Sequence, residues 1–137
     1  MKKLFLLFYL LFISSLCFGQ LNYTESEILK KNGKPDEIID DGKKYVLIYH
    51  KHYDYLDDND IVAVGFSLEY KGSNAKCFMA TIVHQKKYLN KFYNIFFKNF
   101  VKESENVYID YVNNSKWILQ TDTNNDPNFF IVNVVNL

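Results

Sequence analysis

The stretch Lys86–Phe100, KKYLNKFYNIFFKNF, carries the only long helical pattern after residue 19. Its polar residues recur at helical spacing and its apolar residues fall on the opposite side. The polar residues are Lys87, Lys91, Asn94 and Lys98, and the apolar residues are Leu89, Phe92, Ile95, Phe96 and Phe100. An amphipathic helix has this pattern. Segments of strand character lie before and after it, so we predict one helix over residues 86–100 that packs its aromatic face on a sheet.

Phe92 and Phe96 are four residues apart, so they share one helix face. We therefore expect both side chains in the core and not at a binding surface. The neighbouring strands supply the candidate packing partners, which are Val62, Val64, Phe66, Val107, Ile109 and Tyr111.

The N-terminus has the features of a secretory signal peptide. Met1–Lys3 is basic, Leu4–Leu16 is apolar, and Cys17 and Gly19 are small residues before a cleavage point ahead of Gln20. The apolar run is too short for a membrane-spanning anchor, which needs about 20 residues. A lipid anchor on Cys17 is disfavoured because the larger Leu16 precedes it. We expect residues 1–19 to be removed, leaving residues 20–137 as a single α+β domain that is periplasmic or secreted, with no membrane span.

The remaining 118 of 137 residues can bury a core without covalent staples. The chain has equal numbers of basic and acidic residues and no arginine, which argues against a nucleic-acid partner. Cys77 is the only cysteine after the signal, so no intrachain disulfide can form. An exported chain of this size without disulfides fits the bacterial envelope.

Tyr23–Gly33 is predicted to form a short helix. Thr24 and Glu27 have the spacing of a capping box, and Tyr23 and Ile28 that of a hydrophobic staple. Asn32-Gly33 ends the helix, and Pro35 prevents its continuation.

Seven strands are predicted around the two helices. Residues 37–53 are predicted to form a hairpin, in which Asp41-Gly42 gives a two-residue turn between Ile38-Ile39 and an apolar strand at 45–49. The other predicted strands are residues 61–70, 75–84, 105–112, 116–121 and 129–137. The predicted order is α-β-β-β-β-α-β-β-β, and the short turns imply antiparallel pairing in an α+β layer architecture.

The first unit also resembles a known group of proteins. Thr24–Ile28, then Gly33–Asp36, then a hairpin ending at Tyr49 are similar to the opening of SmpA/OmlA-type outer-membrane assembly lipoproteins. β-Lactamase-inhibitor proteins are similar in architecture. The resemblance implies a function in binding other proteins and not in catalysis. It covers about the first quarter of residues 20–137, the lipidated cysteine is missing, and no functional residue is carried over.

His50, His52 and Asp54 alternate along a predicted strand end, so they would share one face and could hold a divalent metal. The alternative is a polar strand end that faces water. No fourth ligand is evident.

Other candidates are less specific. Cys77 and His84 could act as a nucleophile and a base if they met. They are seven residues apart in one predicted strand, which places them on opposite faces unless a bulge intervenes. Asp122, Asn124 and Asp126 have calcium-loop spacing, but Pro127 stands where the loop needs glycine, which favours a simple turn. The acidic residues Asp54, Asp57, Asp58 and Asp60 could collect a cation or merely be solvated.

The chain contains no phosphate loop, nucleophile elbow or zinc-protease motif. We therefore expect a non-catalytic binding or assembly module of the bacterial envelope whose partner is another envelope protein. One alternative is a metal-binding protein or metal-dependent enzyme that uses His50, His52 and Asp54; no other cofactor is expected. The other is a small-molecule binder that uses an aromatic sheet face.

Overall fold

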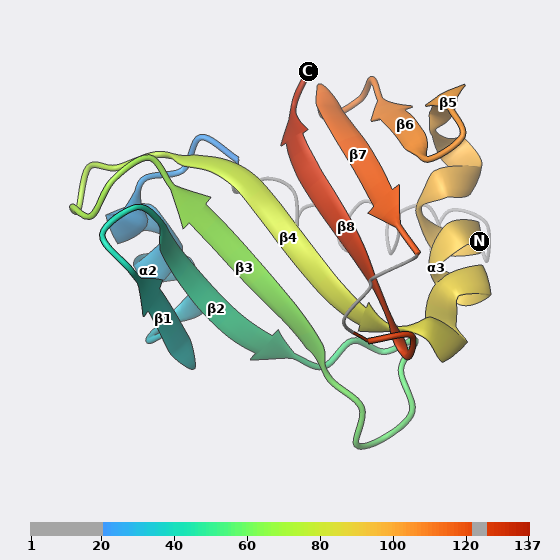
Figure 1. The fold of residues 1–137 in the computed structure, drawn as a ribbon, viewed down its shortest axis with the longest axis horizontal. Helices are drawn as coiled ribbons and strands as arrows, with labels where there is room; N and C mark the ends of the chain where they lie inside the picture. Colours follow the sequence, from blue (N-terminus) through green and yellow to red (C-terminus); the bar gives the residue numbers. More distant parts are fainter. Residues whose placement is uncertain (1–20, 122–125) are drawn as a thin grey trace, which may run out of the picture.

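A computed structural model describes residues 21–121 and 126–137, which form an α+β fold around one antiparallel sheet of eight strands (Figure 1). The predicted signal peptide at 1–19 lies outside the described residues, as do Asp122 and Asn124. The strands are β1 Glu37–Asp40, β2 Tyr45–Lys51, β3 Val62–Leu68, β4 Cys77–Gln85, β5 Val101–Ser104, β6 Val107–Asp110, β7 Ser115–Gln120 and β8 Phe129–Asn136.

The order of the strands across the sheet is β1-β2-β3-β4-β8-β7-β6-β5. Hairpins connect β1 to β4 in sequence. The chain then crosses to the far edge through a helical segment and returns from β5 to β8, which pairs with β4 over Met79–Gln85. The two halves of the chain are therefore joined by the β4–β8 ladder at the middle of the sheet (Figure 1).

Helix α2, Glu25–Asn32, has the predicted capping box. The Glu27 N–H donates to Thr24 Oγ1 at 3.3 Å, and the Thr24 N–H donates to Glu27 Oε2 at 2.8 Å. Ile28 is fully buried. Gly33 has a φ of 78° and ends the helix, and its carbonyl accepts a hydrogen bond from the Tyr49 hydroxyl at 2.9 Å. The bond fastens the helix end to β2.

The predicted helix over residues 86–100 is three helical segments and not one helix. A 3-10 turn at Lys86–Tyr88 leads into α3, Leu89–Ile95, and a second 3-10 turn covers Phe97–Asn99. Phe96 and Phe97 are adjacent, and both are buried. In a continuous α-helix the two side chains would point about 100° apart. The tighter 3-10 turn puts residues three apart on one side, so Phe97 and Phe100 both contact Trp117, with ring centroids 5.8 and 4.8 Å away.

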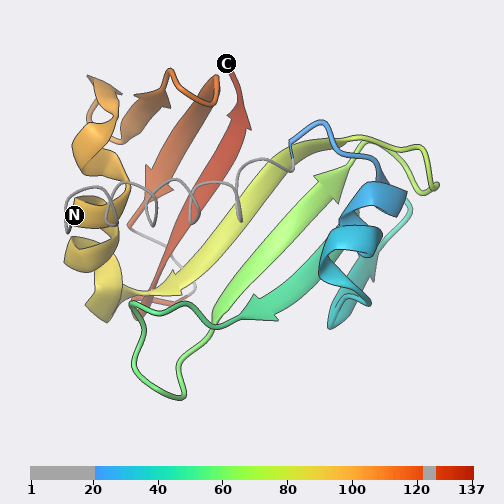
Figure 2. The ribbon, with the colours of Figure 1, turned by 180° about the vertical axis from the view of Figure 1, so that it is seen from behind.

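Both helices lie on one face of the sheet, which we call the covered face (Figures 1 and 2). Phe92 and Phe96 are 1% and 7% exposed, which confirms their prediction as core residues. Phe92 packs on Trp117 of β7 and Phe130 of β8. The aromatic side chains of the described residues thus meet mainly in the layer between α3 and the covered face.

The strand predicted over residues 105–112 is present as β6 but is shorter, and the predicted count of seven strands is wrong. The segment holds β6 and the turns that flank it, and a further strand, β5, begins directly after the helical segment. The expected packing of Val107, Ile109 and Tyr111 against the helix is also wrong. Tyr108 stacks on Phe97 with ring centroids 4.2 Å apart, whereas Tyr111 is 64% exposed. Apolar residues occupy both phases of this segment, so alternation could not identify its inward face.

Candidate functional site

A strip of small residues runs along β3 on the face of the sheet opposite the helices, which we call the open face. The large side chains of β3 point to the covered face; they are Val62, Val64, Phe66 and Leu68. Ala63, Gly65 and Ser67 alternate with them and point to the open face. β3 therefore carries only small side chains, or none at Gly65, on the open face.

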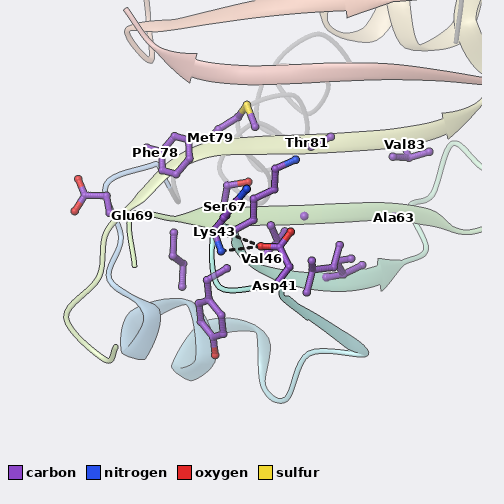
Figure 3. A pocket seen from close by; sticks show the side chains of 16 residues that line it. Asp41, Lys43, Val46, Ala63, Ser67, Glu69, Phe78, Met79, Thr81 and Val83 are labelled. Atoms are coloured by element: carbon purple, nitrogen blue, oxygen red, sulfur yellow. Dashed lines mark hydrogen bonds between the residues drawn. The ribbon is translucent and has the colours of Figure 1, made fainter. Parts of the chain in front are cut away.

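The neighbouring strands carry taller side chains at the same level. Val46 and Ile48 of β2 lie beside Ser67 and Gly65, and Met79, Thr81 and Val83 of β4 lie beside Ser67, Gly65 and Ala63. The backbones of β2 and β4 are two strand spacings apart, about 10 Å. The result is a groove of about 580 Å³ whose floor is β3 and whose walls are β2 and β4 (Figure 3). We call it the β3 groove.

Gly65 sets the depth of the β3 groove. A Cβ atom at this position would lie 3.2 Å from Val46 Cγ1 and 3.9 Å from the Thr81 carbonyl oxygen. Any side chain here would press against the β2 wall and occupy the floor. The β4 wall is tied to β8 by a side-chain hydrogen bond, in which Thr81 Oγ1 donates to Asn133 Oδ1 at 2.8 Å.

The β1–β2 turn closes one end of the groove with charged groups. Its residues Asp41, Lys43 and Lys44 all line the groove (Figure 3). The turn is a four-residue loop and not the predicted two-residue turn, since Asp40 pairs with Tyr45. Asp41 Oδ1 accepts the N–H of Lys43 at 2.8 Å and the N–H of Lys44 at 2.7 Å, and these two bonds lower the pKa of the Asp41 carboxyl.

A bulge in β4 places an aromatic side chain at the same end. The pairing with β3 shifts between Ser67 and Leu68, so Phe78 is an extra residue between Cys77 and Met79. Phe78 lines the groove and is 48% exposed. A bulge commonly re-aims a side chain in this way.

A second polar cluster lies over the other end of β4, on the covered face. Lys87 Nζ is 2.8 Å from Asp60 Oδ2, and the Tyr88 hydroxyl donates to the same oxygen. Lys87 and Tyr88 lower the pKa of Asp60. The Asp57 N–H donates to the Tyr88 hydroxyl at 3.0 Å. These contacts hold the loop 53–60 on the start of the helical segment.

His84 is the buried member of this cluster. It is 1% exposed, and its ring stacks on Phe130 with centroids 5.1 Å apart. Nε2 lies 2.9 Å from the Tyr55 hydroxyl. Burial lowers the pKa of His84 to about 4, against smaller opposing effects of the Gln85 backbone and Asp60. The imidazole is enclosed by the rings of Tyr88, Phe92 and Phe130, so among the described residues it makes packing contacts.

The predicted metal residues lie at a strand end. His50 is in β2 and is exposed, whereas His52 and Asp54 follow the last residue of the strand, Lys51. His52 Nδ1 lies 2.8 Å from the Asp60 carbonyl oxygen. In the described part of the chain, no three His, Cys, Asp or Glu residues are grouped as a metal site would need. Metal binding by His50, His52 and Asp54 stays a prediction.

Cys77 and His84 lie on the same face, which corrects the expectation of opposite faces. The β4 bulge shifts the alternation by one residue, so both side chains point to the covered face. They remain about 23 Å apart at 3.3 Å per strand residue, and do not meet. Cys77 is fully buried, and burial raises the pKa of its thiol to about 11.

Of the calcium-like loop only Asp126 is described, and its carboxylate accepts the Asn128 N–H at 2.9 Å. In the acidic loop, Asp57 and Asp60 both lie within ion-pair distance of Lys87.

The sequence reading missed the β3 groove. Its signal was the size alternation within VAVGFSL, large residues inward and small residues outward, in a strand flanked by branched side chains.

No protein-family model matches the chain, and no curated protein or solved structure is significantly similar to it. The resemblance to envelope assembly proteins stays a prediction. Within residues 21–121 and 126–137, no helix has the length and apolar character needed to cross a membrane.

Proposed function

We propose that the protein is an exported, non-catalytic binding module of the bacterial envelope that holds a ligand in the β3 groove. The observation that carries the proposal is the strip of Ala63, Gly65 and Ser67 between taller walls. A volume of about 580 Å³ lies within the usual range of small-molecule sites, which are concave and mainly apolar.

Binding, and not chemistry, is the use that this groove supports. Its charged side chains come from the β1–β2 turn and from Glu69, all at one end. The buried imidazole of His84 is on the other face of the sheet. A general acid or base must reach the reacting atoms within hydrogen-bond distance, and His84 cannot do so from behind β4.

A second candidate function is docking to another envelope protein through the β6–β7 turn. Tyr111 and Val112 are 64% and 84% exposed at its tip. The buried Asp110 carboxylate holds the turn by accepting the N–H groups of Val112 at 3.0 Å and Asn113 at 3.2 Å. Exposed aromatic residues on a rigid support are common anchors in protein interfaces.

Native mass spectrometry of the protein purified from its own host tests both functions. We expect a bound small molecule on the wild type, its loss from an Ala63→Phe variant that fills the groove, and its retention in Ile118→Phe on β7. A Tyr111→Ser/Val112→Ser variant should lose a protein partner and keep the small molecule. A wild type free of bound mass, with no partner trapped by cross-linking, would contradict the proposal.

The same preparation tests export. A protein that begins at Gln20 supports cleavage of the signal peptide. A mature protein that begins at a diacylated Cys17 would contradict cleavage before Gln20 and would identify the protein as a lipoprotein.

A further inference from the structure

We infer that the β3 groove binds one unbranched aliphatic chain with an anionic head group, a long-chain fatty acid, whose carboxylate lies beside Lys43 and Lys44. This inference rests on the proposed function and names the chemistry of its ligand. Three features of the groove carry it: its shape, the polarity of its walls and the charge at one end.

The shape admits a narrow chain. The small residues follow one strand from Ala63 to Ser67, a length of about 13 Å at 3.3 Å per residue. The walls belong to the strands on either side of β3, so the free width is two strand spacings, about 10 Å, less the width of the wall side chains. Such a trench fits an alkyl chain laid along β3, but a branched or fused-ring ligand would meet Val46 or Met79.

The polarity excludes other extended ligands. Between its ends the groove is lined by aliphatic side chains and by Ser67 and Thr81. The Thr81 hydroxyl hydrogen is already used in the bond to Asn133. A peptide strand lying in the groove would leave its backbone N–H and C=O groups without partners. The backbone groups of β3 are already used in the ladders with β2 and β4. Unpaired polar groups make such burial unfavourable, whereas an alkyl chain has none.

The charge at the turn suits an anion. Lys43 and Lys44 line the groove and are exposed, and neither takes part in the ion pairs found among the described residues. The nearby Asp41 carboxylate is engaged by two backbone N–H groups. Glu69, the other acid at this end, also lines the groove, and its carboxylate extends away from the side chains of Asp41 and Lys43 (Figure 3). A carboxylate beside the two ammonium groups would gain charge-assisted hydrogen bonds.

Titration calorimetry with palmitate below its micelle concentration tests the inference on delipidated protein purified from the host. We expect saturable binding of one palmitate per chain. Ala63→Phe, and independently Val83→Phe in the β4 wall, should weaken it at least ten-fold. Ile118→Phe lies on the same face outside the groove and should bind as wild type. Circular dichroism melts confirm that each variant is folded.

The head group is tested by charge reversal. Lys43→Glu/Lys44→Glu should weaken palmitate about ten-fold but leave the neutral hexadecanol unchanged, and the matched Lys98→Glu on the helical segment should change neither.

Several outcomes would overturn the inference. If the wild type binds no palmitate but carries another small molecule that Ala63→Phe loses, the ligand class is wrong and the proposed function stands. Palmitate binding that is unaffected by either groove-filling variant would reject the groove as a site, and the proposed function with it. A dimer that Ala63→Phe dissociates would identify a second copy as the occupant instead.

Discussion

Phe96 follows the last residue of α3 and contacts Trp117 of the sheet, Phe92 of α3 and Tyr55 of the loop before β3. Its ring centroid lies 4.5 Å from that of Phe92, 5.6 Å from that of Trp117 and 6.4 Å from that of Tyr55. We predict that Phe96→Ala lowers the free energy of unfolding by about 3–5 kcal/mol, because burial energy is lost and a cavity remains. Urea denaturation of variant and wild type measures the difference.

Lys98→Ala is the matched control, since Lys98 is exposed in the second 3-10 turn. It should change stability by less than about 0.5 kcal/mol. Lys91 is a poorer control than its place on the polar stripe suggests, because its ammonium donates to the Tyr55 carbonyl at 3.0 Å. A Phe96→Ala protein as stable as the Lys98→Ala protein would mean that α3 does not hold the fold together.

His84 should make the fold sensitive to mild acid. Its pKa is about 4 in the folded protein and 6.5 in the unfolded chain, so only the unfolded chain takes up a proton between these values. Stability is therefore fully present above pH 6.5 and is lost as the pH falls toward 4. We predict a loss of about 2 kcal/mol between pH 7 and pH 5.

His84→Phe keeps a ring against Phe130 and removes the proton-binding site. Urea melts at pH 7 and pH 5 should show a smaller pH dependence in this variant than in the wild type. Equal pH dependence in the two proteins would show that His84 does not stay neutral in the folded state.

At the scale of elements, α2 was predictable because the residues that begin and end it are close to one another in sequence. Thr24, Glu27, Gly33 and the staple residues act within one helix, and the capping box has the predicted partners. We predict that Thr24→Ala destabilises the fold by about 1 kcal/mol, because the Glu27 N–H loses its acceptor. Thermal denaturation should show a lower midpoint, while Lys30→Ala in the same helix should melt like wild type. An unchanged midpoint for Thr24→Ala would mean that tertiary contacts alone hold α2.

The helical segment and the strands after it were less predictable. The polar stripe at 87–98 identified a helix with its correct buried face, but period alone cannot separate α from 3-10 turns when Phe96 and Phe97 both need burial. β5 was not predicted either, because its residues Val101–Ser104 are all exposed and show no alternation of apolar and polar side chains. The β4 bulge at Phe78 was invisible for a similar reason, since only its pairing with β3 creates it.

At the scale of the whole molecule, the neighbours of β4 could not be predicted. Short turns identified the hairpins, but nothing local indicates that β8 inserts beside β4 rather than at an edge. The open face exists because α2 and α3 both pack on the opposite face of the sheet (Figures 1 and 2). The β3 groove therefore had a sequence signal whose meaning depended on which face the helices cover.

Cys77 reports on the cooperativity of the whole fold. It is fully buried, its thiol donates to the Met79 carbonyl at 3.4 Å, and the strand around it is tied to the entry of α2, where the Cys77 N–H donates to the Tyr23 carbonyl at 2.8 Å. Burial also raises the pKa of the thiol to about 11, so little reactive thiolate forms at neutral pH. We predict that the chain from Gln20 reacts with a thiol reagent only as fast as it unfolds, and at one thiol per chain in urea.

The reaction rate measured against urea concentration decides the point. If β4 opens only with the whole sheet, the rate should rise with the same urea dependence as global unfolding followed by circular dichroism. Phe96→Ala lies in the other half of the molecule and should accelerate the reaction by the factor that its loss of stability implies. Fast labelling of the native wild type, or a disulfide-linked dimer on a non-reducing gel, would mean instead that Cys77 reaches solvent without unfolding and that the β1–β4 half opens independently of the β5–β8 half.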